Sequence, residues 1–264
     1  MKITTRFCTI ALLATAYAVP AAAQDAAAAT EVAAAPEAPA SDFTINGGAT
    51  LVSDYRFRGI SQTDKSLAVQ GTMSVSHSSG FYATVWGSSI DDYVAGFSDQ
   101  EIDFIVGYKK TFGSTTIDGG VLYYYYPGAE EIFPGYDSDF FEPYISVAHS
   151  FGAVTAKVSA AYAPEQNALS IGSGKEDNLY LAGDLSGAIP GVPLALTAHL
   201  GHSFGPSYLT IGKGYTDWSL GAAYTWKALT FGLSYVDTNK SLYSPITGHN
   251  ISKAGVVASV GVAF

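Results

Sequence analysis

The sequence predicts an all-β protein, a closed antiparallel transmembrane β-barrel of about 12 strands. Three observations predict this fold. Apolar and polar residues alternate with a period of two through most of the chain after residue 42. The connections between these segments are short and long in strict alternation along the chain. The chain also ends in an alternating apolar segment that closes on Phe264.

The N-terminus has the pattern of a secretory signal peptide. Lys2 and Arg6 precede an apolar run over residues 7–19, and Ala21 to Ala23 supply the small residues of a cleavage site. The run is too short for a membrane-spanning helix, which needs about 20 residues. We therefore expect three regions: a signal peptide over 1–23, a disordered periplasmic linker rich in Ala and Pro over 24–42, and the outer-membrane barrel over 43–264.

The alternation is clearest in the last third of the chain. From Trp218 to Trp226, every second residue is apolar and faces the other way from Ser219 and Thr225. It is less regular near 81–90, 115–126 and 140–151, where the inward or outward register stays open. Helical spacing fits none of these segments, and no apolar stretch after the signal peptide is long enough for a membrane-spanning helix.

The connections separate a membrane barrel from a soluble β-sandwich, which has no reason to alternate short and long loops. Membrane barrels have short periplasmic turns and longer external loops, and an even number of strands places both termini in the periplasm. The short connections are expected at 78–80, 112–114, 151–152, 187–191 and 226–228. The long ones are expected at 59–66, 91–100, 127–139, 164–177, 203–216 and 238–252.

Charged residues on the polar face are expected to point into the lumen, because an Arg or Lys facing lipid at mid-depth costs about 2–4 kcal/mol. The expected lumen-facing residues are Asp54, Arg56, Arg58, Glu101, Asp103, Asp118, Glu142, Lys157, Asp184, His199 and Asp217. Asp54, Arg56 and Arg58 are spaced two residues apart on one predicted strand. They would form either a row of side chains that contacts a ligand or a ladder of structural ion pairs. An open lumen of this composition would prefer cations, whereas paired charges would occlude it.

The aromatic residues of the apolar face are expected to form two belts against outer-membrane lipid and lipopolysaccharide. The outer belt would contain Tyr55, Phe57, Tyr162, Trp218 and Tyr235. The periplasmic belt would contain Phe43, Tyr108, Tyr224, Trp226, Phe231 and Phe264. The strand that ends at Phe264 also resembles the C-terminal signal read by barrel-assembly machinery, which is therefore an expected partner.

Several motifs resemble a single family in content and order. The most specific is Ser53 to Gln62 (SDYRFRGISQ), followed by Ser79 to Ala83 (SGFYA), Tyr123 to Gly128 (YYYYPG) and Ser234 to Thr238 (SYVDT). Together they resemble the TorF family across essentially the whole mature domain. The resemblance implies a proteobacterial outer-membrane protein with a porin-like barrel. It implies no catalytic residues, because the family's role in transport is itself only proposed.

The predicted function is passive diffusion of small hydrophilic solutes through a porin. The alternatives are an occluded barrel whose loops make surface contacts and an outer-membrane hydrolase, although no serine stands in a G-x-S-x-G context. No enzyme activity, cofactor or metal is expected, because the histidines are scattered and Cys8 lies in the signal peptide. The chain has 13 basic against 23 acidic residues, which excludes nucleic acid as a partner.

Overall fold

The computed structural model describes residues 41–131, 135–172 and 174–264. The predicted signal peptide, 1–23, and nearly all of the predicted linker, 24–42, lie outside the described residues. No helix in the described ranges is long and apolar enough to cross a membrane.

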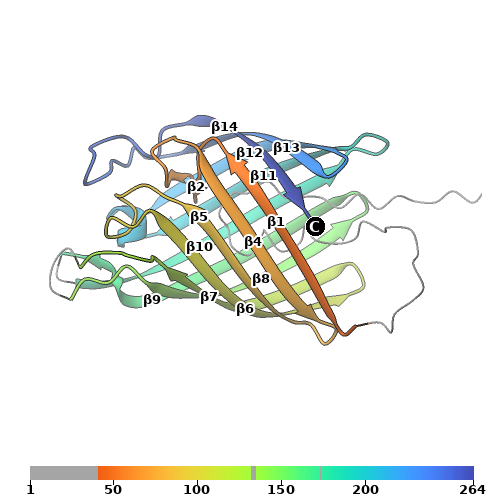
Figure 1. Ribbon diagram of the computed structural model, residues 1–264, viewed down its shortest axis with the longest axis horizontal. Coiled ribbons are helices and arrows are strands. Elements are labelled where there is room, and N and C mark those ends of the chain that lie inside the picture. The colour runs from red at the N-terminus through yellow and green to blue at the C-terminus, as the bar shows by residue number, and fades with distance from the viewer. Residues whose placement is uncertain (1–40, 132–134, 173) are drawn as a thin grey trace, which may run out of the picture.

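Twelve antiparallel strands form one closed barrel, as predicted (Figure 1). The first strand, β1, is hydrogen-bonded to β4 on one side and to the last strand, β14, on the other, with Val52 opposite Ser259. Reciprocal backbone bonds between Gly47 and Phe264 complete this seam. The strands are β1 (Phe43–Val52), β4 (Ala68–His77), β5 (Phe81–Ser89), β6 (Gln100–Phe112), β7 (Thr115–Tyr125), β8 (Phe140–Phe151), β9 (Val154–Ile171), β10 (Gly174–Ala188), β11 (Leu194–Phe204), β12 (Tyr215–Trp226), β13 (Leu229–Thr238) and β14 (Gly255–Ala263). Closure leaves no unpaired edge around the wall of the barrel.

The barrel has two unlike ends. We call one the turn end, because it carries the five short connections and the outermost described residues of β1 and β14. We call the other the loop end; in Figure 1 it lies at the left and the turn end at the right. The loop end carries the longer connections 53–67, 90–99, 126–139, 205–214 and 239–254, the fourth of which contains the short helix η1 (Tyr208–Thr210).

The outer surface of the barrel is apolar and the inner surface is polar. On β13, Leu233 is 57% exposed while its neighbour Ser234 is 3% exposed. Large apolar side chains are exposed in the same alternating way on each of the twelve strands. A continuous apolar exterior of this size is the surface of a barrel that sits in lipid.

The predicted long loop over 164–177 is wrong. Strands β9 and β10 continue through this region, beyond their last pairs with β8 at Tyr144 and with β11 at Phe204. They pair only with each other there, with register irregularities near Glu176. Pro164 and the glycines at 172 and 174 are tolerated here, because a two-stranded ribbon needs no hydrogen-bond partner on its free edges.

The first strand is also shorter than predicted. It ends at Val52, so Asp54, Arg56 and Arg58 are not on a wall strand, and Tyr55 and Phe57 do not belong to an outer aromatic belt. Both aromatic side chains are buried inside the barrel, at 0% and 7% exposure. The other predicted belt residues are on the outer surface, where they are exposed or, for Trp218, partly buried.

Substituting an outward residue at mid-strand tests the assigned lipid face. Leu233→Arg should lower the free energy of unfolding in lipid vesicles by about 2–4 kcal/mol, because the guanidinium would face hydrocarbon. Leu233→Ala removes the same side chain without adding charge and serves as the control. Equal loss of stability in the two variants, measured by denaturant titration of the folded barrel, would contradict the assignment.

Candidate functional site

Residues 53–67, which we call the inner segment, connect β1 to β4 by folding into the barrel. Within it, β2 (Arg56–Phe57) and β3 (Ile60–Ser61) form a small hairpin with Phe57 opposite Ile60. The two turn residues, Arg58 and Gly59, both have positive φ, 48° and 81°. A two-residue turn of this type matches the twist of the strands it joins and favours glycine.

The hairpin tip is packed tightly against the inner face of β12 and β13, which follow β14 around the barrel from β1. A Cβ atom added at Gly59 would lie 2.6 Å from Thr238 Cγ2 and 2.9 Å from Asp217 Cβ, so only glycine fits there. The tip therefore lies against β12 and β13, and the Arg58 side chain extends from it towards β8 and β10.

An internal ion pair holds the inner segment in shape. Arg56 Nε lies 2.6 Å from Asp54 Oδ2, and the Ser61 hydroxyl donates to the other carboxylate oxygen at 2.6 Å. Arg56 Nη1 also donates to the backbone oxygens of Gly59 and Lys253, each at 3.0 Å. Asp54 and Arg56 are thus inside the barrel, as predicted, but their charges satisfy each other and the backbone.

Arg58 attaches the inner segment to the far wall. Its Nη2 lies 2.6 Å from Glu142 Oε2 on β8, and its Nη1 donates to Asn178 Oδ1 on β10 at 3.2 Å. The guanidinium also lies over the Tyr180 ring, 4.2 Å from its centre. Burial opposes the charged form, but the Glu142 carboxylate outweighs it and raises the pKa of Arg58.

A second polar network runs along the wall formed by β9 to β12. His199 Nδ1 lies 2.7 Å from Asp184, and its Nε2 lies 3.1 Å from Asp217. Lys157 Nζ lies 3.5 Å from the other oxygen of Asp184, and the Tyr180 hydroxyl donates to Asp217 at 3.1 Å. Tyr180 therefore connects this wall network to Arg58.

Three further acidic residues lie on the opposite wall. The Tyr55 hydroxyl of the inner segment donates to both oxygens of Glu101, at 3.3 and 3.2 Å. In the described part of the chain, Oδ1 of Asp103 is buried without a hydrogen-bond partner. Asp118 lies nearer the turn end, where it accepts a 2.7 Å bond from Tyr82, whose hydroxyl also contacts that of Tyr144.

The inner segment divides the lumen into two halves. In the loop-end half, side chains from Asp54 to Gln62 and on the facing walls are buried. In the turn-end half, inward side chains keep partial exposure; examples are Asn46, Thr72, Ser74 and Ser259. Space for water therefore remains between the turn end and the inner segment.

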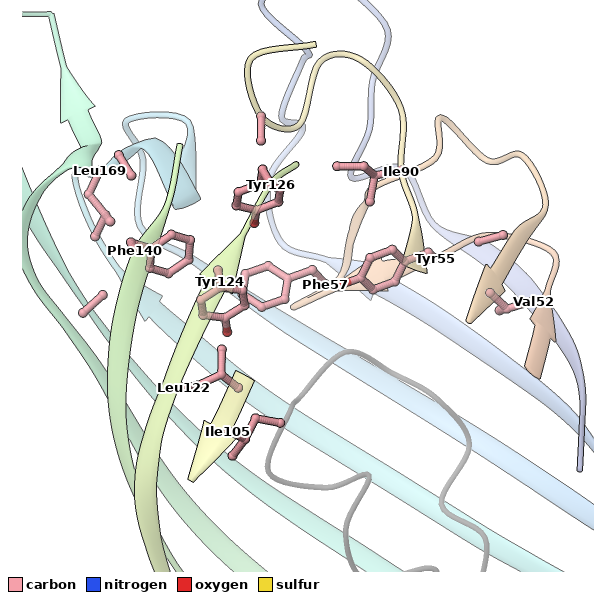
Figure 2. Close-up of a cluster of buried hydrophobic side chains, with 14 of the residues drawn as sticks. Val52, Tyr55, Phe57, Ile90, Ile105, Leu122, Tyr124, Tyr126, Phe140 and Leu169 are labelled. Carbon is pink, nitrogen blue, oxygen red and sulfur yellow. The ribbon is translucent and has the colours of Figure 1, made fainter. Parts of the chain in front are cut away.

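Aromatic side chains pack around the inner segment on its loop-end side (Figure 2). The Tyr124 ring stacks on Phe140 with centroids 4.1 Å apart, and Phe57 meets Tyr124 edge-on at 6.0 Å. Tyr55 meets Trp86 of β5 in the same way. Beyond this cluster, towards the loop end, lies a cavity of about 690 Å³.

The eleven residues predicted to face the lumen are buried or half-buried, but three of them lie on the inner segment and not on a wall strand, because alternation continues there as it would in a strand. Among the functional residues it missed are Asn178 and Tyr180, which receive Arg58. In the described ranges, no group of three or more His, Cys, Asp or Glu side chains could hold a metal ion.

The apolar exterior, the closed sheet and the charged interior define a membrane β-barrel of the porin type. Two solved porin structures share this fold. The NanC porin has a TM-score of 0.53 and 13% sequence identity, and the match covers 84% of this chain and 99% of NanC. The KdgM porin has a TM-score of 0.52 and 10% sequence identity, and the match covers 83% of this chain and 97% of KdgM. The chain belongs to the bacterial family Gcw_chp, a family of unknown function whose model matches residues 36–264. The TorF name itself stays a prediction, and no curated protein matches the sequence.

Loss of the Arg58 side chain should release the inner segment without opening the barrel. Removing one partner of a buried ion pair costs about 3–5 kcal/mol, so amide exchange over residues 55–61 should be at least about 100-fold faster in Arg58→Ala. Lys65→Ala, at an exposed position of the same segment, is the matched control. Unchanged exchange over 55–61 in Arg58→Ala would show that this ion pair does not hold the segment.

Proposed function

We propose that this protein is an outer-membrane channel for small hydrophilic solutes, narrowed at its loop end by the inner segment. The observation that carries the proposal is the polar inner face on a closed barrel with an apolar exterior. Passive diffusion needs a hydrated path and no reaction chemistry. The partly exposed side chains in the turn-end half supply that half of such a path.

In the proposed orientation the loop end faces the outside of the cell and the turn end faces the periplasm. Both described ends of the chain then lie on the periplasmic side, and the strand ending at Phe264 is available to barrel-assembly machinery. Short turns at one end and long loops at the other support this orientation, as do exposed Trp226 and Phe231 in the proposed periplasmic belt. Outer-membrane lipid and lipopolysaccharide would surround the apolar exterior.

The charges inside the barrel support a preference for cations. Arg56, Arg58 and Lys157 each have an acidic partner within 4 Å. No salt bridge is found to Glu101 or Asp103 within the described ranges. A low-dielectric wall focuses such an excess of negative charge along the pore axis.

We propose a non-enzymatic role. His199 is the inward histidine, but both of its ring nitrogens are bonded, one to Asp184 and the other to Asp217 and the Tyr180 hydroxyl. A general base needs a ring nitrogen free to accept a proton from a nucleophile. The arrangement suits a structural bridge between strands.

Recording in planar bilayers tests the channel. Purified folded barrel should give discrete conductance steps in KCl, smaller than an unobstructed lumen would give, because the inner segment lies inside the lumen and narrows it. Reproducible absence of steps from barrel shown to be folded by its heat-dependent mobility on a gel would favour the alternative, an occluded barrel whose loops make surface contacts.

Selectivity should depend on acidic residues according to their partners. Asp103→Asn should lower the cation-to-anion permeability ratio measured from reversal potentials, because this carboxylate lacks a basic partner. Asp184→Asn should change the ratio less, since Lys157 and His199 lie against that carboxylate. The difference should fade towards 1 M salt, where the screening length is about 3 Å. An equal ratio in wild type and Asp103→Asn would remove Asp103 as a selectivity residue.

A further inference from the structure

The cavity of about 690 Å³ at the loop end is bounded by the inner segment, β6 to β9 and the loops 90–99, 205–214 and 239–254, together with Tyr126, Tyr136 and Ser138 between β7 and β8. Its volume lies within the range of about 300–1,000 Å³ that is usual for small-molecule sites. Ile171 and Ile246 line it and are 39% and 48% exposed, so the cavity opens at the loop end. A solute would meet it before the inner segment.

The cavity lining is mostly apolar and rich in aromatic rings. Six of these side chains come from the inner segment, from β7 and β8, and from three loops: Phe57, Tyr93, Tyr124, Tyr126, Phe140 and Tyr208. Several are held rigidly, since Tyr124 stacks on Phe140 and the Tyr93 hydroxyl donates to the Ser61 backbone oxygen at 2.5 Å. Rigid rings accept an apolar or cationic group with little loss of side-chain entropy.

Only one charged residue lines the cavity within the described ranges, and it is acidic. Glu101 lies at the floor with 2% exposure, and no Lys, Arg or His is among the lining residues. Asp103 lies two residues further along β6 and is also buried. A buried carboxylate without a basic partner is stabilised by any cation that reaches it. The cavity is therefore complementary to positive charge.

We propose that this cavity binds an organic cation with an apolar body, placing its ammonium group near Glu101 and its body against the tyrosine and phenylalanine rings. A ring face attracts a cation and also covers apolar surface, so the lining suits both parts of such a molecule. An anion would meet an acidic residue and no basic one, and a neutral apolar molecule would leave the Glu101 carboxyl group without a cationic partner. The inference rests on the proposed function, because it names a class of solute that would enter the mouth of the channel. Binding in the cavity does not itself require that the barrel conducts.

Fluorescence titration of the barrel in lipid nanodiscs tests the proposal. The probes are dansylcadaverine, which carries a primary ammonium group, and N-pentyl dansylamide, which has the same body without it. Wild type should bind dansylcadaverine about tenfold or more tightly than the neutral probe, and Glu101→Gln should remove that difference. Glu165→Gln, at an exposed position on β9, is the matched control and should bind as wild type does. Ser170→Trp, which fills the cavity from its lining, should abolish binding of both probes.

Equal affinity of wild type for the two probes would overturn the ligand class, as would unchanged dansylcadaverine binding in Glu101→Gln. Unchanged binding in a folded Ser170→Trp barrel would overturn the site. The outcome is separable from that of the channel proposal. A barrel that binds dansylcadaverine but shows no conductance steps contradicts the channel alone, and one that conducts without binding it contradicts the cavity proposal alone.

Discussion

A strand that faces lipid on one side must place its mid-strand charges on the other, and this constraint concentrates charge inside a narrow lumen. Such charges need counter-charges or hydrogen bonds, because the space around them excludes most water. Here the inner segment supplies both. Arg58 neutralises Glu142, and the Tyr55 hydroxyl donates to Glu101. The polar wall and the segment that narrows the lumen therefore stabilise each other.

The fold was largely predictable because a period of two identifies a strand between lipid and a polar lumen without any knowledge of its neighbours. The twelve strands and the closed barrel follow from that pattern and from short turns such as 78–80. The extension of β9 and β10 was not predictable, since a ribbon that pairs on one side carries no such constraint. Residues 164–177 were therefore predicted as a loop, although most of them belong to this ribbon.

The inner segment shows why the site was harder to predict than the fold. Ser53 to Arg58 alternates like the strand before it, and alternation alone cannot distinguish a wall from a hairpin buried on all sides. The available signal was Gly59, which follows two closely spaced arginines and marks a turn that needs positive φ. Partners contributed by distant strands, such as Asn178, carry no mark in the sequence. The cavity also escaped prediction, because its lining comes from seven separate segments of the chain.

The central claim is that the inner segment narrows the lumen between the turn-end half and the loop-end cavity and so sets the size of the channel. Strands β1 and β4 already pair as far as Val52 and Ala68, so residues 53–67 can be replaced by an Asn-Gly turn that joins them directly. The decisive measurement is the single-channel conductance of this variant beside that of the wild type, with folding of both checked by heat-dependent gel mobility. A several-fold larger conductance in the folded variant is the predicted result. A conductance equal to that of the wild type would contradict the claim.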